Sequence, residues 1–295
     1  MYKSFILFYF ICLIFSISYS QTIKGVVKDS ITQTPLAFTS LVLLGGTGTY
    51  ANTEGEFELQ VKRVKNDTLK VQLLGFETKL IPLSSIQNIT TILLNPLAEE
   101  LNEVTITSTK IDYTKSIIIG EPKEGNIGFT SLIGYETCML IENPKKQIGK
   151  LKRVYIDLKK RKDADDIATF NIKFYKYDSV THIPGDLLYT KNLYVKPKNK
   201  NYRLWINVED LDVMFLKEGI CIGVEWINTT EEKQKYAKYG PMFRYTLSQE
   251  NKGITWSNYH QTGWKDVLTN HEKYKRIDTG ILNPMIGIEV LYPTK

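Results

Sequence analysis

Hydrophobic and polar residues alternate through the first hundred residues of the chain and predict short β-strands. Between residues 56 and 61 the side chains of Phe57, Leu59 and Val61 fall on one face, and acidic or amide side chains fall on the other. This is the pattern of a half-buried strand. Turn residues separate the runs and no helical period occurs, so a small antiparallel sandwich is expected. The other expected strands cover residues 22–28, a run ending at residue 42, 68–73 and 90–94.

The acidic stretch N-T-E-G-E at residues 52–56 is compatible with a turn or with a metal site. Asn52 and Gly55 tolerate left-handed backbone angles, and Glu56 points to water from the start of the following strand. A calcium loop of the EF-hand type needs further oxygen ligands at fixed offsets and a late glutamate, which this stretch lacks. We therefore predict a turn.

Five motifs in this region follow one another as I-K-G-V-V-K-D, T-P-L-A-F, A-N-T-E-G-E-F-E-L, L-L-G-F-E-T and I-L-L-N. In this order they resemble the carboxypeptidase-regulatory-like domain, a transthyretin-like seven-stranded sandwich widespread in exported proteins of Gram-negative bacteria. The resemblance covers residues 21–96 and implies a non-catalytic accessory module. Asn52 and Glu54 stand where the family favours an acidic T-D-x-G turn. No peptidase is implied, because His182 has Gly185 where a zinc-binding H-x-x-E pair needs glutamate.

Residues 97–127 are predicted to link two domains. Their first part, L-A-E-E-L-N-E-V-T-I-T-S-T-K, resembles the segment that leads from such a sandwich into the plug of TonB-dependent outer-membrane transporters. Proline, glycines and charges follow, as in a domain boundary. About 185 residues remain, too few for a transporter barrel. The chain is therefore not expected to be a transporter by itself.

A second series of strand patterns occupies residues 128–295. In F-N-I-K-F-Y-K-Y the side chains of Phe170, Ile172 and Phe174 take one face, and the intervening side chains take the other. The number and length of such runs predict a second β-sandwich, of the jelly-roll type, and hence an all-β protein. The expected strands cover residues 151–158, 168–177, 187–195, 202–208, 219–227, 241–247 and 285–292.

Residues 1–20 have the features of a secretory signal peptide. Lys3 precedes an apolar run from Phe5 to Ile17, and small residues lead to a cleavage site after Ser20. The run of about thirteen residues is shorter than the roughly twenty that span a bilayer, so cleavage is expected and an uncleaved anchor is the alternative. Export to the periplasm or the outer membrane is therefore expected, without a transmembrane segment in the mature chain.

The charge of the chain bears on its binding partners, and its cysteines bear on disulfide formation. The chain has 38 Lys and Arg against 32 Asp and Glu, and its cations are scattered. Short basic runs at residues 159–162 and 196–200 indicate solvated loop tips, so nucleic acid is not an expected partner. Cys138 and Cys221, both flanked by apolar residues, either form one disulfide in an oxidising compartment or remain buried thiols.

Catalytic and metal motifs are sparse. The sequence contains no G-x-S-x-G, H-E-x-x-H, C-x-x-C or P-loop motif. No catalytic residue is assigned and no cofactor is expected. The densest acidic group, Asp163, Asp165 and Asp166 in K-D-A-D-D, is either a solvated loop tip or a weak site for a structural Ca²⁺.

The most suggestive stretch is G-I-T-W-S-N-Y-H-Q-T-G-W at residues 253–264. Aromatic rings can stack on the C–H face of a sugar while amide and imidazole groups bind its hydroxyls. In the alternative reading the two tryptophans fill the core and the polar residues face water. The candidate ligand-binding residues are Trp256, Asn258, Tyr259, His260, Gln261 and Trp264.

These features together predict an exported, non-catalytic binding or structural module of the cell envelope that recognises a glycan or an envelope protein. One alternative is an envelope hydrolase that uses acidic residues of the second sandwich, which two carboxylates with raised pKa in a cleft would favour. Another is a scaffold partner of an outer-membrane transport complex, which an exposed apolar patch or an unpaired edge strand on the first domain would favour.

Overall fold

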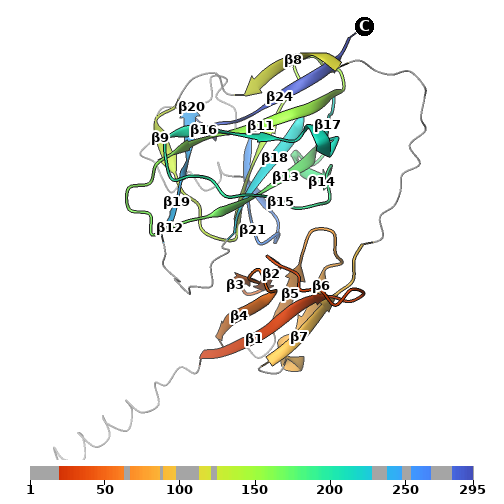
Figure 1. Ribbon diagram of the computed structural model, residues 1–295, viewed down its shortest axis with the longest axis vertical. Coiled ribbons are helices and arrows are strands. Elements are labelled where there is room, and N and C mark those ends of the chain that lie inside the picture. The colour runs from red at the N-terminus through yellow and green to blue at the C-terminus, as the bar shows by residue number, and fades with distance from the viewer. Residues whose placement is uncertain are drawn as a thin grey trace, which may run out of the picture.

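The computed structural model shows two β-sandwiches one after the other (Figure 1), which confirms the all-β prediction. Residues 1–19, most of the predicted signal peptide, lie outside the described residues. No helix in the described part is long and apolar enough to cross a membrane; its two helical segments are 3-10 turns at Leu83–Ser85 and Glu209–Leu211. The structure describes residues 20–62, 67–86, 89–97, 113–120, 125–227, 238–247, 254–266 and 281–294.

Seven strands in two sheets form the first sandwich, as predicted. One sheet has the order β4-β1-β7 and the other the order β3-β2-β5-β6. Phe57, Leu59 and Val61 of β4 are buried between the sheets, on the face that the alternation predicted. The strands are β1 (Ser20–Asp29), β2 (Ser40–Leu43), β3 (Gly48–Tyr50), β4 (Glu56–Lys62), β5 (Thr68–Gln72), β6 (Lys79–Pro82) and β7 (Ile89–Leu94).

The acidic stretch before β4 is a turn. Asn52 Oδ1 accepts hydrogen bonds from the backbone N–H groups of Glu54 and Glu56 at 3.0 and 2.8 Å. Gly55 has a φ of 73°, and a Cβ there would lie 2.6 Å from the carbonyl oxygen of Val27. Glycine is therefore needed at this position, whereas Asn52 contributes its side-chain acceptor.

Two larger antiparallel sheets form the second sandwich, which confirms that prediction. The seven-stranded sheet has the order β14-β13-β18-β10-β21-β22, with β15 beside β13. Phe170, Ile172 and Phe174 of β13 pack with Trp226 in the core between the sheets. The strands of this sheet are β10 (Tyr135–Ile141), β13 (Thr169–Asp178), β14 (Ile183–Leu187), β15 (Leu193–Val195), β18 (Ile220–Ile227), β21 (Thr255–Tyr259) and β22 (Trp264–Asp266).

The eight-stranded sheet has the order β23-β20-β11-β24-β8, with β16 and β17 beside β11 and β9 beside β20. A short parallel pair, β12 (Asp166–Ile167) and β19 (Tyr239–Gly240), stands apart. The strands of the large sheet are β8 (Tyr113–Gly120), β9 (Ile127–Phe129), β11 (Gly149–Lys159), β16 (Tyr202–Asn207), β17 (Met214–Phe215), β20 (Met242–Leu247), β23 (Leu282–Pro284) and β24 (Ile286–Pro293).

Two elements differ from the expected organisation. The segment 97–127, predicted as a linker, includes β8, which pairs with β24 at the edge of the eight-stranded sheet. Its Ile118 is 58% exposed between two isoleucines that pack on the core. Because three consecutive isoleucines show no apolar–polar alternation, the sequence pattern did not indicate this strand. The strand expected at 187–195 is two strands, β14 and β15, which both pair with β13.

Candidate functional site

The outer face of the seven-stranded sheet carries charged residues that are nevertheless buried. Lys173 on β13, Glu225 on β18 and Glu136 on β10 are 2%, 4% and 2% exposed. They lie on three adjacent strands, and Glu136 stands directly opposite Glu225 in the register. Strand alternation explains why they share a face. Their burial requires a cover over that face.

Lys173 bridges the two carboxylates. Its Nζ lies 3.1 Å from Glu136 Oε2 and 3.0 Å from Glu225 Oε2. Burial alone would lower the pKa of Lys173, but the two carboxylates reverse this and raise it. Burial raises the pKa of Glu136 in spite of Lys173. Burial would also raise the pKa of Glu225, but Lys173 and a hydrogen bond from Tyr50 outweigh it and lower that pKa.

The first sandwich provides the cover. Tyr50 of β3 donates a hydrogen bond from its hydroxyl to Glu225 Oε1 at 2.7 Å, and its ring stacks on the imidazole of His260 with centroids 4.8 Å apart. Ser40 of β2 is hydrogen-bonded to Nδ1 of the same imidazole at 2.5 Å. Burial, followed by the charge of Glu225, raises the pKa of Tyr50. We call these residues the interdomain cluster: Ser40, Tyr50, Glu136, Lys173, Glu225 and His260.

His260 occupies a narrow site between the two domains. It lies just after β21 with a φ of 44° and is 2% exposed. Gly48 of the first sandwich and Gly134 of the second flank the ring. A Cβ at Gly48 would lie 2.8 Å from Nε2, and one at Gly134 would collide with it. Burial lowers the pKa of His260 to about 4, against the opposing effect of Glu225. The imidazole is therefore neutral at pH 7.

Further contacts join the outer side of β2, β3 and β5 to the second sandwich. Lys70 Nζ donates a hydrogen bond to the carbonyl oxygen of Gln261 at 2.9 Å, and Gln72 Nε2 donates to the side-chain oxygen of Gln261 at 3.4 Å. The rings of Phe38 and Tyr194 meet edge to face with centroids 4.8 Å apart. The two sandwiches are thus docked through polar and aromatic contacts.

The interdomain cluster contains groups suited to acid–base chemistry but has no access for a substrate. A general acid or base must reach the proton that it transfers. Glu136, Lys173, Glu225 and His260 are all 4% exposed or less, and Tyr50 and Ser40 occupy the side that faces the first sandwich. Removing one partner of a buried ion pair typically destabilises a protein by about 3–5 kcal/mol. The arrangement is therefore that of a structural interface between two domains.

The two candidate tryptophans lie on the same face of the sheet as the interdomain cluster, in a separate aromatic cluster. Trp256 is 7% exposed, and its ring lies 6.2 Å from that of Tyr177. Trp264 is half-buried and packs edge to face on Tyr175 at 5.3 Å. Exposed His182 is hydrogen-bonded through Nδ1 to the Tyr177 hydroxyl at 3.1 Å. We call these five residues the aromatic cluster.

The other candidate ligand residues are directed elsewhere. Asn258 is buried, and its Oδ1 accepts a hydrogen bond from the backbone N–H of Gly263 at 3.1 Å. Tyr259 packs on Tyr135 with centroids 4.8 Å apart. His260 and Gln261 contact the first sandwich, as described above. The structure therefore places Trp256 and Trp264 in one cluster. Asn258 stands opposite Trp264 in the register but is buried and bonded to Gly263, and the other three residues lie outside the cluster.

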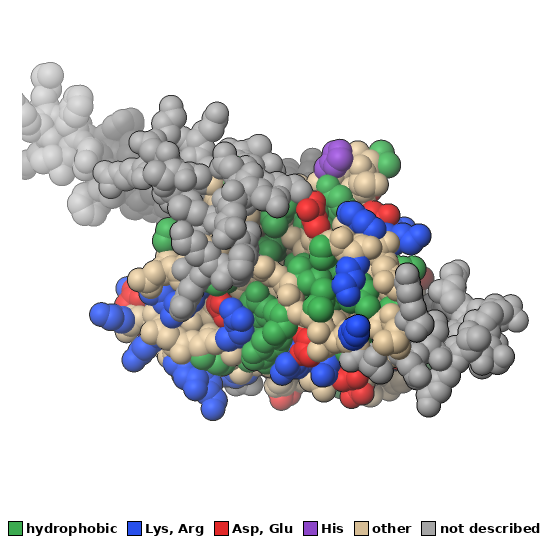
Figure 2. Space-filling view, turned by 90° about the horizontal axis from the view of Figure 1, so that it is seen from above, with side chains coloured by type: hydrophobic (Ala, Val, Ile, Leu, Met, Phe, Trp, Pro, Cys, Tyr) green, Lys and Arg blue, Asp and Glu red, His purple; other side chains and the backbone are tan. Residues whose placement is uncertain are grey.

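The outer face of the eight-stranded sheet carries a second set of aromatic rings (Figure 2), seen there as hydrophobic side chains among cations and carboxylates. The guanidinium of Arg153 lies 4.4 Å from the Trp205 ring centroid, and that of Arg203 lies 4.0 Å from the Tyr155 ring centroid. Arg203 also forms a two-bond ion pair with Asp157 at 2.7 and 2.8 Å. Trp205 is therefore an outer-face residue stacked against a cation.

The remaining candidate groups have protein partners. Asp163 pairs with Arg161 at 3.1 Å and with Lys238 at 3.2 Å, and Asp165 accepts a hydrogen bond from the Lys238 backbone at 2.8 Å. Asp166 Oδ1 accepts one from the backbone of Ile167 at 2.7 Å. Within the described residues no group of three His, Cys, Asp or Glu side chains is arranged to hold a metal ion. The calcium site stays a prediction.

The two cysteines are buried, free thiols beneath the aromatic cluster. Cys138 on β10 and Cys221 on β18 are offset diagonally, because Leu140 is the register partner of Cys221. Burial raises the pKa of the Cys138 thiol well above its usual value. Of the two readings left open by the sequence, the structure has the buried thiols.

The sequence analysis missed Glu136, Lys173 and Glu225. Each is a charged residue inside a strand of apolar neighbours, in Y-E-T-C-M-L-I, F-N-I-K-F and G-V-E-W-I. Since charged side chains are rarely buried unless paired, two acids and one base in three such strands were the available indication. Gly223 was a further indication of this buried cluster, because a Cβ at that position would collide with the carboxylate of Glu136.

Comparison with known proteins identifies the first sandwich. Residues 23–106 match the CarboxypepD_reg-like domain family, which confirms the resemblance found in the sequence. The chain is also 30% identical over 115 residues to the TonB-dependent receptor SusC of Bacteroides thetaiotaomicron. That match covers 37% of this chain but only 11% of the receptor.

Solved structures resemble the chain only distantly. The cysteine protease and lectin-like domains of Cwp84, a surface layer associated protein of Clostridium difficile, align with a TM-score of 0.36 and 10% identity, over 94% of this chain and 59% of that one. A DUF3823 family protein of Bacteroides uniformis aligns with a TM-score of 0.21 and 10% identity, over 93% of this chain and 100% of that one.

Proposed function

We propose that this chain, whose residues 23–106 form a CarboxypepD_reg-like domain, is a non-catalytic binding module of the cell envelope. One observation carries the proposal: the buried acid–base groups of the second sandwich hold the two domains together. Glu136 has the raised pKa that a hydrolase would use. It lies beneath Tyr50 and the rest of the interdomain cluster instead of in a cleft.

The envelope location has two supports. The first twenty residues have the pattern of a secretory signal peptide. The 115-residue similarity to a TonB-dependent receptor of a bacterium is the second support. A module of this kind would bind its ligand on the second sandwich while the first sandwich holds that sandwich in a fixed orientation.

The proposed ligand is a glycan, and the proposed contact surface is the aromatic cluster. Tyr177 and Trp264 are half-buried and His182 is exposed, so part of each side chain faces solvent. Trp256 and Tyr175 are 7% exposed and support the outer rings from behind. Rings held in this way offer a sugar an apolar face at low entropic cost, and the imidazole offers a hydrogen bond.

A glycan array with the exported form, residues 21–295, tests this function. We expect the wild type to bind a set of glycans and the Tyr177→Ala, Trp264→Ala double variant to bind them at least about tenfold more weakly, as for loss of a central contact. Trp205→Ala is the matched control, because it removes a half-buried tryptophan from the opposite face. Equal binding by all three proteins, or no binding by the wild type, would contradict the proposal.

A further inference from the structure

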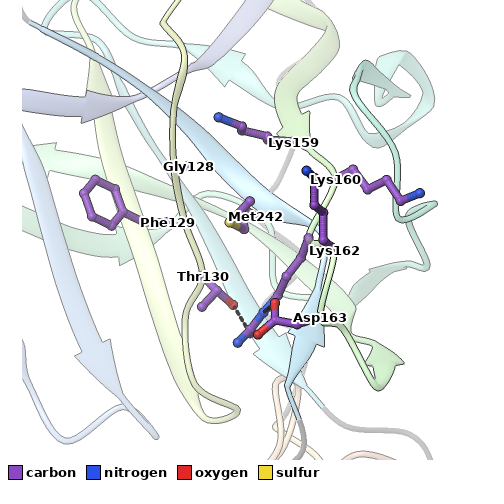
Figure 3. Close-up of a pocket in the computed structure, with 9 residues that line it drawn as sticks. Gly128, Phe129, Thr130, Lys159, Lys160, Lys162, Asp163 and Met242 are labelled. Atoms are coloured by element: carbon purple, nitrogen blue, oxygen red, sulfur yellow. Dashed lines mark hydrogen bonds and ion pairs between the residues drawn. The ribbon is translucent and has the colours of Figure 1, made fainter.

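A hollow lined by cations lies at the end of β11, away from the aromatic cluster. Figure 3 shows it between the segment around Gly128 and the turn that follows Lys159. Its volume is about 510 Å³, within the range of small-molecule sites. Met242 lies at its centre, and four consecutive cations, residues 159–162, belong to its lining, although the side chain of Lys160 points away from Met242.

Side chains from a distant loop fix the backbone of these cations. Asn201 Oδ1 accepts a hydrogen bond from the N–H of Lys160 at 2.8 Å. Asn199 Oδ1 accepts one from the N–H of Arg161 at 2.9 Å, and Asn199 Nδ2 donates to the Arg161 carbonyl at 2.9 Å. Asn199 belongs to the second basic run of the sequence, residues 196–200, and Asn201 follows it directly. Two runs that looked like separate loop tips therefore form one surface.

Positive charge predominates on this surface. The carboxylate of Asp163 is shared between Arg161 and Lys238. The ammonium of Lys159 is held by the carbonyl and side-chain oxygens of Asn126, which are uncharged. Lys160 and Lys162 are exposed, and within the described residues no carboxylate pairs with either. We call the cations of this surface the basic ledge: Lys159, Lys160, Lys162, Lys198 and Lys200.

We propose that the hollow and the basic ledge bind the acidic groups, carboxylate or sulfate, of a polysaccharide. The inference rests on the proposed glycan-binding function and adds a second site with a defined ligand class. A hollow with a fixed backbone suits one acidic sugar, and the neighbouring loop extends the positive surface to the next acidic groups along the polymer. Tyr202, against whose ring Lys200 lies at 5.0 Å, borders the same loop.

Titration of the exported form, residues 21–295, with polygalacturonate, dextran sulfate and neutral dextran tests the site. We expect binding to the two acidic polymers, none to neutral dextran, and weakening in 0.5 M NaCl because the charges are exposed. The Lys160→Gln, Lys162→Gln variant should bind at least about tenfold more weakly, from loss of two charge-assisted contacts. Both side chains are exposed, so its melting temperature should match that of the wild type.

The matched control is Lys115→Gln, Lys217→Gln, which removes the same charge near the opposite end of β11. Its binding should stay within about twofold of the wild type. An equal loss of polymer binding in both variants, or no loss in the Lys160→Gln, Lys162→Gln variant, would contradict the proposed role of the basic ledge. Binding to phosphatidylglycerol vesicles but to neither acidic polymer overturns the ligand class. If glycans on the array bind through the aromatic cluster but neither acidic polymer binds, this inference is wrong and the proposed function stands. If neither the glycans nor the acidic polymers bind, both proposals are wrong.

Discussion

The two outer faces of the second sandwich carry the same kinds of residue, but their charged side chains differ in solvent exposure. On the seven-stranded sheet, the side chains of Lys173, Glu136 and Glu225 are 2–5% exposed. On the eight-stranded sheet, Arg203 keeps 40% of its side chain exposed beside Asp157. Strand alternation places charge outward on both sheets. The first sandwich docks on the seven-stranded sheet, where cation and carboxylates are all buried; on the other sheet the carboxylates Asp157 and Glu289 are buried, but the arginines paired with them stay in solvent.

That difference sets how much each charge contributes to stability. A buried ion pair depends on both partners, because removing one leaves the other desolvated and uncompensated. An exposed pair gains little in water and is screened by salt. Substitutions on the two faces should therefore differ in size by several kcal/mol, although the residues involved look alike in the sequence.

The largest effect is expected for Lys173→Met, which keeps the size of the side chain and removes its charge. Glu136 and Glu225 would then face each other, buried and without their cation. We expect the free energy of unfolding to fall by about 3–5 kcal/mol, measured by urea denaturation. Lys24→Met is the control, since its pair with Glu58 is exposed, and it should cost less than about 1 kcal/mol. Similar losses in the two variants would refute the contrast between buried and exposed ion pairs.

A pH effect should come next, from His260. Its pKa is about 4 in the folded protein and near 6.5 when unfolded, so between these values the unfolded chain binds more protons. Stability should therefore be complete above pH 6.5 and decrease as the pH falls toward 4, by about 2 kcal/mol at pH 5. The measurement is a series of urea unfolding curves from pH 7.5 to pH 5.

The His260→Gln variant isolates this contribution. Glu136 has a raised pKa and acts in the opposite direction, because its contribution to stability is lost as the pH rises. The difference between the wild-type and variant curves should nevertheless carry the histidine slope, since both proteins contain Glu136. Parallel curves would show that His260 is not buried and neutral in solution.

The fold was largely predictable from local patterns. Period-2 alternation around Phe57 and Phe170 located strands and their core faces correctly, and N-T-E-G-E was recognised as a turn because Gly55 requires its backbone angle. β8, an edge strand, was missed because its three consecutive isoleucines, residues 117–119, show no apolar–polar alternation. Local pattern thus predicts strands best where one face is clearly buried.

The site was less predictable, since it depends on contacts between distant residues. Alternation assigned Lys173 to the face opposite the core, which is correct, but alternation alone cannot show that a second domain covers that face. His260 looked like a sugar ligand because its sequence neighbours are aromatic and polar. Its actual partner, Ser40, lies 220 residues away. Such pairings come from docking geometry, which no local pattern contains.

A smaller effect is expected for Tyr50→Phe, which removes one hydrogen bond across the domain boundary. The hydroxyl donates to the charged Glu225 at 2.7 Å, and bonds to charged groups contribute about 1.5–3 kcal/mol. Because Lys173 still pairs with Glu225, we expect a loss near 1.5 kcal/mol in urea denaturation. A loss below about 0.5 kcal/mol would show that the hydroxyl is hydrated in solution.

The smallest effect is expected for Arg203→Met on the eight-stranded sheet. The substitution removes the ion pair with Asp157 and the contact with the Tyr155 ring. The arginine side chain is 40% exposed, although that of Asp157 is only 9% exposed; because solvent reaches the cation and weakens both interactions, we expect a loss of at most about 1 kcal/mol. In 1 M NaCl this loss should shrink, whereas that of Lys173→Met should persist because water and salt do not reach the interdomain cluster. If the Arg203 substitution instead costs as much as that of Lys173, its face is covered as well, and a partner for the eight-stranded sheet should be sought.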